Sequence, residues 1–117
     1  MTPDERTALN EAVCKRLGWE SETRLVLHKT YEATFWKPPG QERFDQPLQP
    51  DFTSDWNAVY RWIVPAVKEM RLGKKNAFHY RLFLPASERA LPHEMHIVYL
   101  YATPEDYCRA FLAVTES

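Results

Sequence analysis

Apolar residues recur at helical spacing in the first part of the chain. Leu9, Val13 and Leu17 lie four residues apart, which places them on one face of a helix. A threonine, a proline and two acidic residues precede this stripe, as in an N-cap followed by a first helical turn. Gly18 is the residue type that commonly closes a helix. The pattern predicts a helix over residues 3–17.

The strongest helical pattern lies in the middle of the chain. Its apolar positions are three or four residues apart: Trp56, Val59, Tyr60, Ile63, Val64, Val67 and Met70. Either Thr53 or Ser54 has the residue type of an N-cap, and Gly73 is expected to end the helix. Pro65 lies inside the pattern. Because it lacks a backbone N–H and crowds the preceding turn, we expect a kink or a restart of the helix there.

Four further segments are typical of strands. Residues 24–28 and 31–36 are rich in β-forming residues, and residues 78–84 alternate between apolar and polar positions. Residues 95–101 are almost continuously apolar, as in a strand that is buried on both faces. A last helix is expected to begin at Pro104, behind a threonine cap.

In chain order these elements are α-β-β-α-β-β-α. The sequence therefore predicts one α/β (α+β) domain over residues 1–117, in which a mainly antiparallel sheet is packed by helices as an α-β-α sandwich. Residues 37–54 show no periodicity. Such a long irregular segment in a small domain is typical of a functional loop.

Composition narrows the classes of function without selecting one. The net charge of −1 gives the molecule no overall attraction to nucleic acid, and 44% hydrophobic residues argue against disorder. No apolar run approaches the ~18 residues of a membrane span, so we expect a soluble, cytoplasmic protein. Cys14 and Cys108 fall in helical patterns and are expected to be reduced and buried. Because the chain has only 3 glycines and no glycine-rich loop, P-loop and dinucleotide-binding folds are excluded and no cofactor is predicted.

Polar candidates for a ligand-binding site gather at the start of the middle helix. Asp51, Asp55 and Asn57 are placed to meet a ligand there, because free backbone N–H groups attract anions, and Arg61 lies one turn further on. The alternative is that these residues cap and orient the helix.

Aromatic residues extend this candidate site. Trp36, Trp56, Trp62 and Phe44 together are more aromatic residues than a core of this size needs. Trp36 and Trp56 flank the irregular segment 37–54, where they can stack on a base or anchor a protein partner. Core packing is the alternative for both.

A basic cluster follows the middle helix and consists of Lys68, Arg71, Lys74 and Lys75. It suits either the phosphates of a nucleotide or nucleic acid, or the negative end of the helix dipole. His93 and His96 do not have the four-residue spacing of a helical zinc motif, so no metal site is predicted.

Three segments resemble one known family. They are residues 9–19, which end in Leu-Gly-Trp, the segment Trp36-Lys37-Pro38-Pro39-Gly40 together with residues 50–58, and residues 102–112. In this order they resemble the phage ABA sandwich domain. The resemblance implies a helix–sheet–helix fold and a phage or prophage accessory protein in the bacterial cytoplasm. It supplies no catalytic residues, and the segments 78–84 and 95–101 do not match it.

The leading hypothesis is a non-catalytic binding module for a host protein or for a small signalling ligand such as a nucleotide. Homo-oligomers are compatible with it, whereas a membrane partner is not expected and nucleic acid is disfavoured. The alternative is a small metal-dependent hydrolase or nuclease that uses Asp51 and Asp55. No catalytic residue is predicted in the leading hypothesis.

Overall fold

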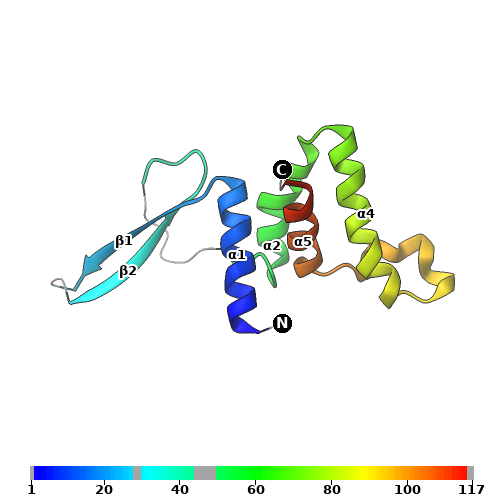
Figure 1. The fold of residues 1–117 in the computed structure, drawn as a ribbon, viewed down its shortest axis with the longest axis horizontal. Coiled ribbons are helices and arrows are strands. Elements are labelled where there is room, and N and C mark those ends of the chain that lie inside the picture. The colour runs from blue at the N-terminus through cyan, green and yellow to red at the C-terminus, as the bar shows by residue number, and fades with distance from the viewer. Residues whose placement is uncertain (1, 28–29, 44–49, 116–117) are drawn as a thin grey trace.

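The computed structural model describes residues 2–27, 30–43 and 50–115. Its elements are α1 (Pro3–Leu17), β1 (Glu20–Val26), β2 (Tyr31–Lys37), α2 (Trp56–Ala58), the π-helix η1 (Val59–Ile63), α3 (Val64–Lys68), α4 (Leu72–Arg89), the 3-10 segment η2 (Pro92–Tyr101) and α5 (Pro104–Thr115). Figure 1 shows the two strands as a hairpin that extends away from a body of helices. The molecule is accordingly long and narrow, at 61 × 31 × 24 Å.

The predicted α-β-α sandwich is wrong. Within the described residues the sheet has two strands only, β1 and β2, which pair antiparallel. They confirm the strands predicted at residues 24–28 and 31–36, although β1 begins earlier, at Glu20, and residue 28 lies outside the described residues. The segments 78–84 and 95–101 are not strands, because they belong to α4 and η2. The chain is therefore mostly helical.

Helical spacing explains the first of these two errors. Phe78, Leu82 and Ala86 lie four residues apart and are the buried residues of α4. A strand would bury Tyr80 and Leu84 on the same face as Phe78 and Leu82, yet both are exposed. A seven-residue segment fits either period, and the residues before and after it, which continue the helix, decide between them. Gly73, predicted to end a helix, lies instead in the first turn of α4.

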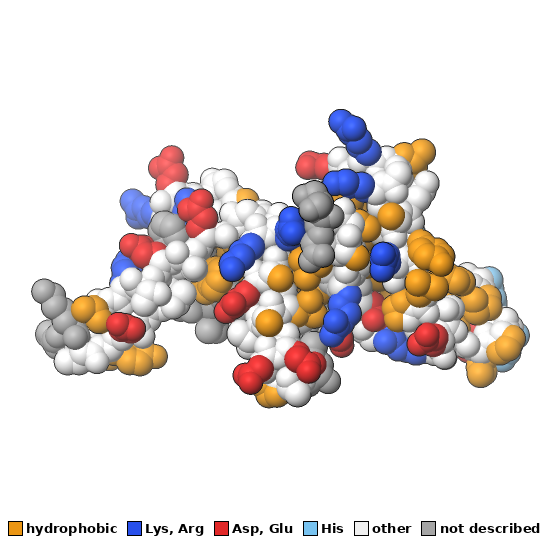
Figure 2. Space-filling view, viewed as in Figure 1, with side chains coloured by type: hydrophobic (Ala, Val, Ile, Leu, Met, Phe, Trp, Pro, Cys, Tyr) orange, Lys and Arg blue, Asp and Glu red, His pale blue; other side chains and the backbone are white. Residues whose placement is uncertain are grey.

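The second error concerns residues 95–101. Of the residues in η2 only Val98 is buried, whereas Leu100 is 79% exposed. A continuous apolar run suggests a strand buried on both faces, but here it coils as a 3-10 segment with most side chains directed outward. Figure 2 shows hydrophobic side chains gathered on the end of the molecule that α4 and η2 form.

The prediction for the first helix is confirmed. The hydroxyl of Thr2 accepts the Glu5 N–H at 3.2 Å, so it caps α1 at Pro3. At the other end Gly18 has a φ of 91°, a left-handed conformation that glycine adopts without steric cost. The turn brings Trp19 back onto the helical body, where its ring meets that of Trp62 edge to face at 5.0 Å.

The predicted middle helix is present in three pieces. Asp55, and neither Thr53 nor Ser54, is its N-cap. The Val64 N–H bonds to the Val59 carbonyl across five residues, which makes η1 a π-turn, and α3 then starts with Pro65 as its second residue. Ile63 and Val64 keep helical backbone angles, so the irregularity predicted at Pro65 takes the form of a π-turn within a continuous helical path, and the backbone shows no restart there.

The core lies where α5 packs against α1, α4 and η1. Its largest fully buried side chains are Phe52, Ile63, Leu82, Val13, Val59, Cys14 and Cys108. The two cysteines are buried thiols, as predicted, and desolvation raises the pKa of each to about 12.

A hydrogen-bonded clamp fixes the start of α5. Thr103 and Asp106 form a capping box, in which the Thr103 N–H bonds to the Asp106 carboxylate at 2.8 Å and the Asp106 N–H bonds to the Thr103 hydroxyl at 3.2 Å. Arg89 donates from the end of α4 to the same carboxylate at 2.5 Å and to the Tyr101 carbonyl at 3.0 Å. Burial alone raises the pKa of Asp106, but the bonds from Arg89 and Thr103 outweigh it and lower the pKa. The clamp thus joins α4, η2 and α5.

Candidate functional site

Asp51, the first of the predicted site residues, is part of the fold's own hydrogen-bond network. Its carboxylate accepts from the side-chain amide of Asn10 on α1 at 3.1 Å and from the backbone and hydroxyl of Thr53 at 3.2 and 2.7 Å. The Ser54 hydroxyl donates to its other oxygen. Burial alone raises the pKa of Asp51, yet these four hydrogen bonds lower it to about 2. The contacts match the capping interpretation of this residue.

Asp55 also has a structural role, whereas Asn57 contributes its backbone N–H to the capping bond. The Asp55 carboxylate accepts the Asn57 N–H at 2.9 Å, which is the capping bond of α2. Both side chains are exposed. The guanidinium of Arg61 lies over the ring of Trp62, 5.4 Å from its centroid, so this side chain is held against the surface of η1.

The two predicted aromatic site residues lie in different parts of the fold. Trp36, on β2, is half-buried and packs against the core. Trp56, on α2, remains 37% exposed and its ring stacks with that of Tyr60 at 5.5 Å. The same Trp56 ring meets the Tyr107 ring edge to face at 5.4 Å. Through Tyr107, Trp56 is connected to the pocket described next.

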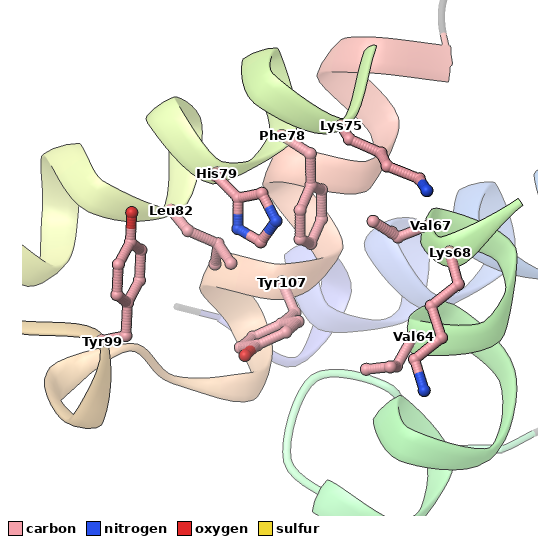
Figure 3. A pocket seen from close by; sticks show the side chains of 9 residues that line it. All are labelled: Val64, Val67, Lys68, Lys75, Phe78, His79, Leu82, Tyr99 and Tyr107. Carbon is pink, nitrogen blue, oxygen red and sulfur yellow. The ribbon is translucent and has the colours of Figure 1, made fainter. Parts of the chain in front are cut away.

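A pocket of about 440 Å³ opens between α3, α4, η2 and α5. We call it the α3–α4 pocket, and Figure 3 shows the nine side chains that line it: Val64, Val67, Lys68, Lys75, Phe78, His79, Leu82, Tyr99 and Tyr107. Its volume lies within the range of about 300–1,000 Å³ that is usual for small-molecule sites.

Ring side chains form one wall of the α3–α4 pocket. Phe78 lies 5.8 Å from both His79 and Tyr107 in edge-to-face geometry, and His79 lies 6.2 Å from Tyr99. Trp56 continues the series behind Tyr107. Burial, followed by the nearby hydroxyl of Tyr60, raises the pKa of Tyr107, so this phenol stays neutral at pH 7.

The charge on the pocket lining is positive. Lys68 and Lys75 are its two cations, and no carboxylate is among the nine described residues that line it. Neither lysine takes part in an ion pair with another residue in the described part of the chain. In Figure 3 both ammonium groups lie toward one end of the pocket, whereas Tyr99 lies at the opposite end. The pocket therefore has a cationic end and an aromatic end.

The sequence pattern indicates part of this site. Lys68 and Lys75 belong to the basic cluster, but Arg71 and Lys74 do not line the pocket. The apolar and aromatic lining residues Phe78, Leu82 and Tyr99 are not found from the sequence, because their segments of α4 and η2 resemble strands. The helical spacing of Phe78 and Leu82 is the pattern that points to the correct wall.

The described residues contain no group of three or more His, Cys, Asp or Glu side chains that could hold a metal ion. They also contain no helix that is both long enough and apolar enough to cross a bilayer. Comparison of the chain with protein-family models, with curated proteins and with solved structures gives no match. The resemblance to the phage domain stays a prediction, and the sandwich fold that it implies is not the fold of this chain.

Proposed function

We propose that this chain is a non-catalytic binding module, and that the α3–α4 pocket takes a small molecule with a flat ring and an anionic group. A nucleoside monophosphate is the simplest representative of that class. The observation that supports the proposal is the combination of two lysines with a wall of rings in one pocket.

Shape and polarity support a ring-bearing ligand. Val64, Val67 and Leu82 supply apolar surface, and Phe78 and Tyr107 present rings within the same space. Burying a flat ring against aromatic and aliphatic side chains removes apolar area from water, which stabilises a complex by about 25 cal/mol per Å². Stacking of a base on an aromatic side chain contributes roughly 1–3 kcal/mol.

Charge supports an anionic group on the same ligand. In Figure 3 the two ammonium groups lie apart on the side of the pocket away from Tyr99, so a phosphate there must draw both flexible lysine side chains toward it. It would then accept charge-assisted hydrogen bonds, which are about twice as strong as neutral ones. Because both ammonium groups lie at one end, the ligand is expected to place its phosphate there and its ring toward His79 and Tyr99. The pocket thus selects an orientation as well as a class of ligand.

Binding is favoured over hydrolysis by the groups that are present. Among the nine lining residues there is no carboxylate, serine or cysteine. The alternative of metal-dependent hydrolysis at Asp51 and Asp55 stays a prediction, and the geometry does not favour it because their oxygens already bind protein donors. A host-protein partner, a phage or prophage origin and a location in the bacterial cytoplasm likewise stay proposals.

The experiment is isothermal titration calorimetry with AMP and, for comparison, adenosine. We expect Lys75→Met and Lys68→Met each to weaken AMP binding by roughly tenfold, because each removes one charge-assisted contact. Lys74→Met is the matched control, since Lys74 is exposed on the same helix but does not line the pocket. Adenosine should bind more weakly than AMP and respond little to any lysine variant.

Two results would contradict the proposal. The first is the absence of saturable binding when AMP, GMP, CMP or UMP is added up to about 1 mM. A dissociation constant of about 1 mM corresponds to a binding free energy of only about −4 kcal/mol. The second is an equal loss of affinity in Lys74→Met and Lys75→Met, which would show a response to net charge and not to the pocket.

A further inference from the structure

The β1–β2 hairpin lacks the support that a hairpin of this kind ordinarily needs. An isolated two-stranded ribbon is marginally stable in water, and three or more strands or a packed helix usually support it. Here Glu20 to Leu25 of β1 are all exposed, whereas the second half of β2 is half-buried. In the described residues no third strand pairs with either one. The outer edge of β1 is therefore an open template for another strand.

We infer that this edge pairs with β1 of a second copy of the chain, which joins two hairpins into one four-stranded antiparallel sheet. The inference is independent of the α3–α4 pocket. It rests on the charge pattern along β1, whose residues read Glu-Ser-Glu-Thr-Arg-Leu-Val from Glu20 to Val26.

A two-fold axis that passes by Thr23 makes this pattern complementary to itself. In that register Thr23 lies opposite Thr23 of the second copy, and Glu22 lies opposite its Arg24. The two-fold axis generates the Glu22–Arg24 pair twice, once from each copy, so two opposite-charge pairs form on the same face of the sheet. Directly opposite ion pairs stabilise antiparallel strands, and like charges in the same positions destabilise them.

The neighbouring registers are disfavoured. A two-fold axis perpendicular to the sheet keeps each residue on the same face in both copies. Residues directly opposite each other in an antiparallel pair also have their side chains on one face. The two-fold pairing must therefore be centred on a residue and not between two residues. Centring it on Glu22 forms two Glu20–Arg24 pairs but places the Glu22 carboxylate opposite its own copy, and centring it on Arg24 places two guanidinium groups opposite each other. A pairing of β2 with itself about Thr34 brings Glu32 opposite Trp36 and forms no ion pair. The charges therefore select the Thr23 register.

Contacts within one chain already involve both charged side chains. Glu22 and Arg24 approach each other at 3.6 Å on the same face of β1, and the Arg24 guanidinium lies 4.1 Å from the centroid of the Phe35 ring on β2. Arg24 therefore leans over β2, and pairing across the outer edge of β1 requires its side chain to turn toward Glu22 of the second copy. In the pair of hairpins each would gain a partner across the new edge.

Disulfide trapping tests the register directly. In the inferred pairing the two copies of residue 23 have their Cα atoms about 4.5–5.5 Å apart, a distance that a disulfide spans. Thr23→Cys should cross-link into a dimer under mild oxidation with copper phenanthroline. Ser21→Cys should not cross-link with itself, because its opposite residue is Leu25, but a mixture of Ser21→Cys with Leu25→Cys should. The native Cys14 and Cys108 are buried and do not interfere.

Charge exchange tests the origin of the affinity. In sedimentation equilibrium, Arg24→Glu should weaken the dimer by roughly tenfold or more, because two attractive pairs become repulsive. The exchange E22R/R24E should restore the affinity, since it keeps opposite charges facing each other. Equal cross-linking of Thr23→Cys and Ser21→Cys, a wild-type chain that stays monomeric, or an exchange variant no better than Arg24→Glu would overturn the inference.

Discussion

Replacing Asp51 with alanine tests whether this carboxylate is a structural residue or a site residue. The change removes the acceptor of four hydrogen bonds: one from Asn10 connects α1 to the turn before α2, and three from Thr53 and Ser54 fix the turn itself. Asn10 is affected most, because its side-chain amide is buried and the amide oxygen already has no hydrogen-bond partner among the described residues. After the substitution the Asn10 amide nitrogen would lose its acceptor as well.

The magnitude follows from these contacts. A buried donor left without an acceptor costs about 1–3 kcal/mol, which applies to Asn10 and to Thr53, and the exposed bond from Ser54 contributes about 0.5–1.5 kcal/mol. We expect Asp51→Ala to lower the free energy of unfolding by about 3 kcal/mol. Asp55→Ala removes one exposed capping bond and should cost about 1 kcal/mol, so it serves as the matched control.

Urea unfolding followed by tryptophan fluorescence measures both variants, since the chain has 4 tryptophans. A second substitution identifies the cause. Asn10→Leu, introduced into the Asp51→Ala background, removes the orphaned amide and should recover about 1–2 kcal/mol. The same substitution in the wild-type chain should be destabilising, because Asp51 then loses one of its donors.

Two outcomes would contradict a structural role for Asp51. One is an Asp51→Ala variant that is as stable as the wild type. The other is a rise in stability with Mg²⁺ or Mn²⁺ that occurs in the wild type but not in Asp51→Ala. The second outcome would restore the hypothesis of a metal-dependent hydrolase.

Three further predictions concern pH, the clamp and the thiols. Folding lowers the pKa values of Asp51 and Asp106 below the ordinary carboxyl value near 4. The stability that these two carboxylates contribute is therefore present above about pH 4 and is lost as the pH falls toward 2. The urea concentration at the unfolding midpoint should decline in the order pH 7, pH 4, pH 3. Arg89→Met should lower the free energy of unfolding by about 2–4 kcal/mol in a urea titration, because it leaves the Asp106 carboxylate buried without its cation. A decrease smaller than about 0.5 kcal/mol would contradict the stabilising role of the clamp. Cys14 and Cys108 should react with Ellman's reagent only after unfolding, because burial raises both thiol pKa values to about 12, and rapid reaction of the native protein would show that the core opens.

Elements with local determinants can be predicted from the sequence. The prediction of the first helix is correct because a threonine cap, a proline and Gly18 mark its ends, and each makes the contact its type suggests. An irregularity at Pro65 follows from the missing N–H of proline, and it takes the form of the π-turn η1. These features depend on a few neighbouring residues, so tertiary context does not override them.

The sandwich prediction fails where the pattern allows two periods. Residues 78–84 satisfy alternation as well as helical spacing, and the chain forms the helix that buries Phe78, Leu82 and Ala86, with α4 packed against α5. The apolar run at residues 95–101 has no period at all, and its composition alone does not reveal that Leu100 and its neighbours are exposed. Without these two strands the described residues form only the two-stranded hairpin and no central sheet.

The prediction of the site fails for a related reason. Acidic and amide residues before a helix suit a ligand and a cap equally well, and the contacts of Asp51 and Asp55 are those of caps. The α3–α4 pocket joins side chains from four elements, so its existence depends on how α3, α4, η2 and α5 pack. A wrong secondary structure for two of these elements conceals it, although the basic cluster contains Lys68 and Lys75.

A two-dimensional ¹H–¹⁵N NMR titration of the wild-type protein with AMP tests the proposed binding site most sharply. We expect saturable shifts of the amides of the pocket-lining residues, Lys68, Phe78, His79 and Tyr99 among them, with the amides of residues 51–57 moving far less. Shifts confined to residues 51–57, or no saturable shift at any concentration of AMP, would show that the α3–α4 pocket is not the binding site.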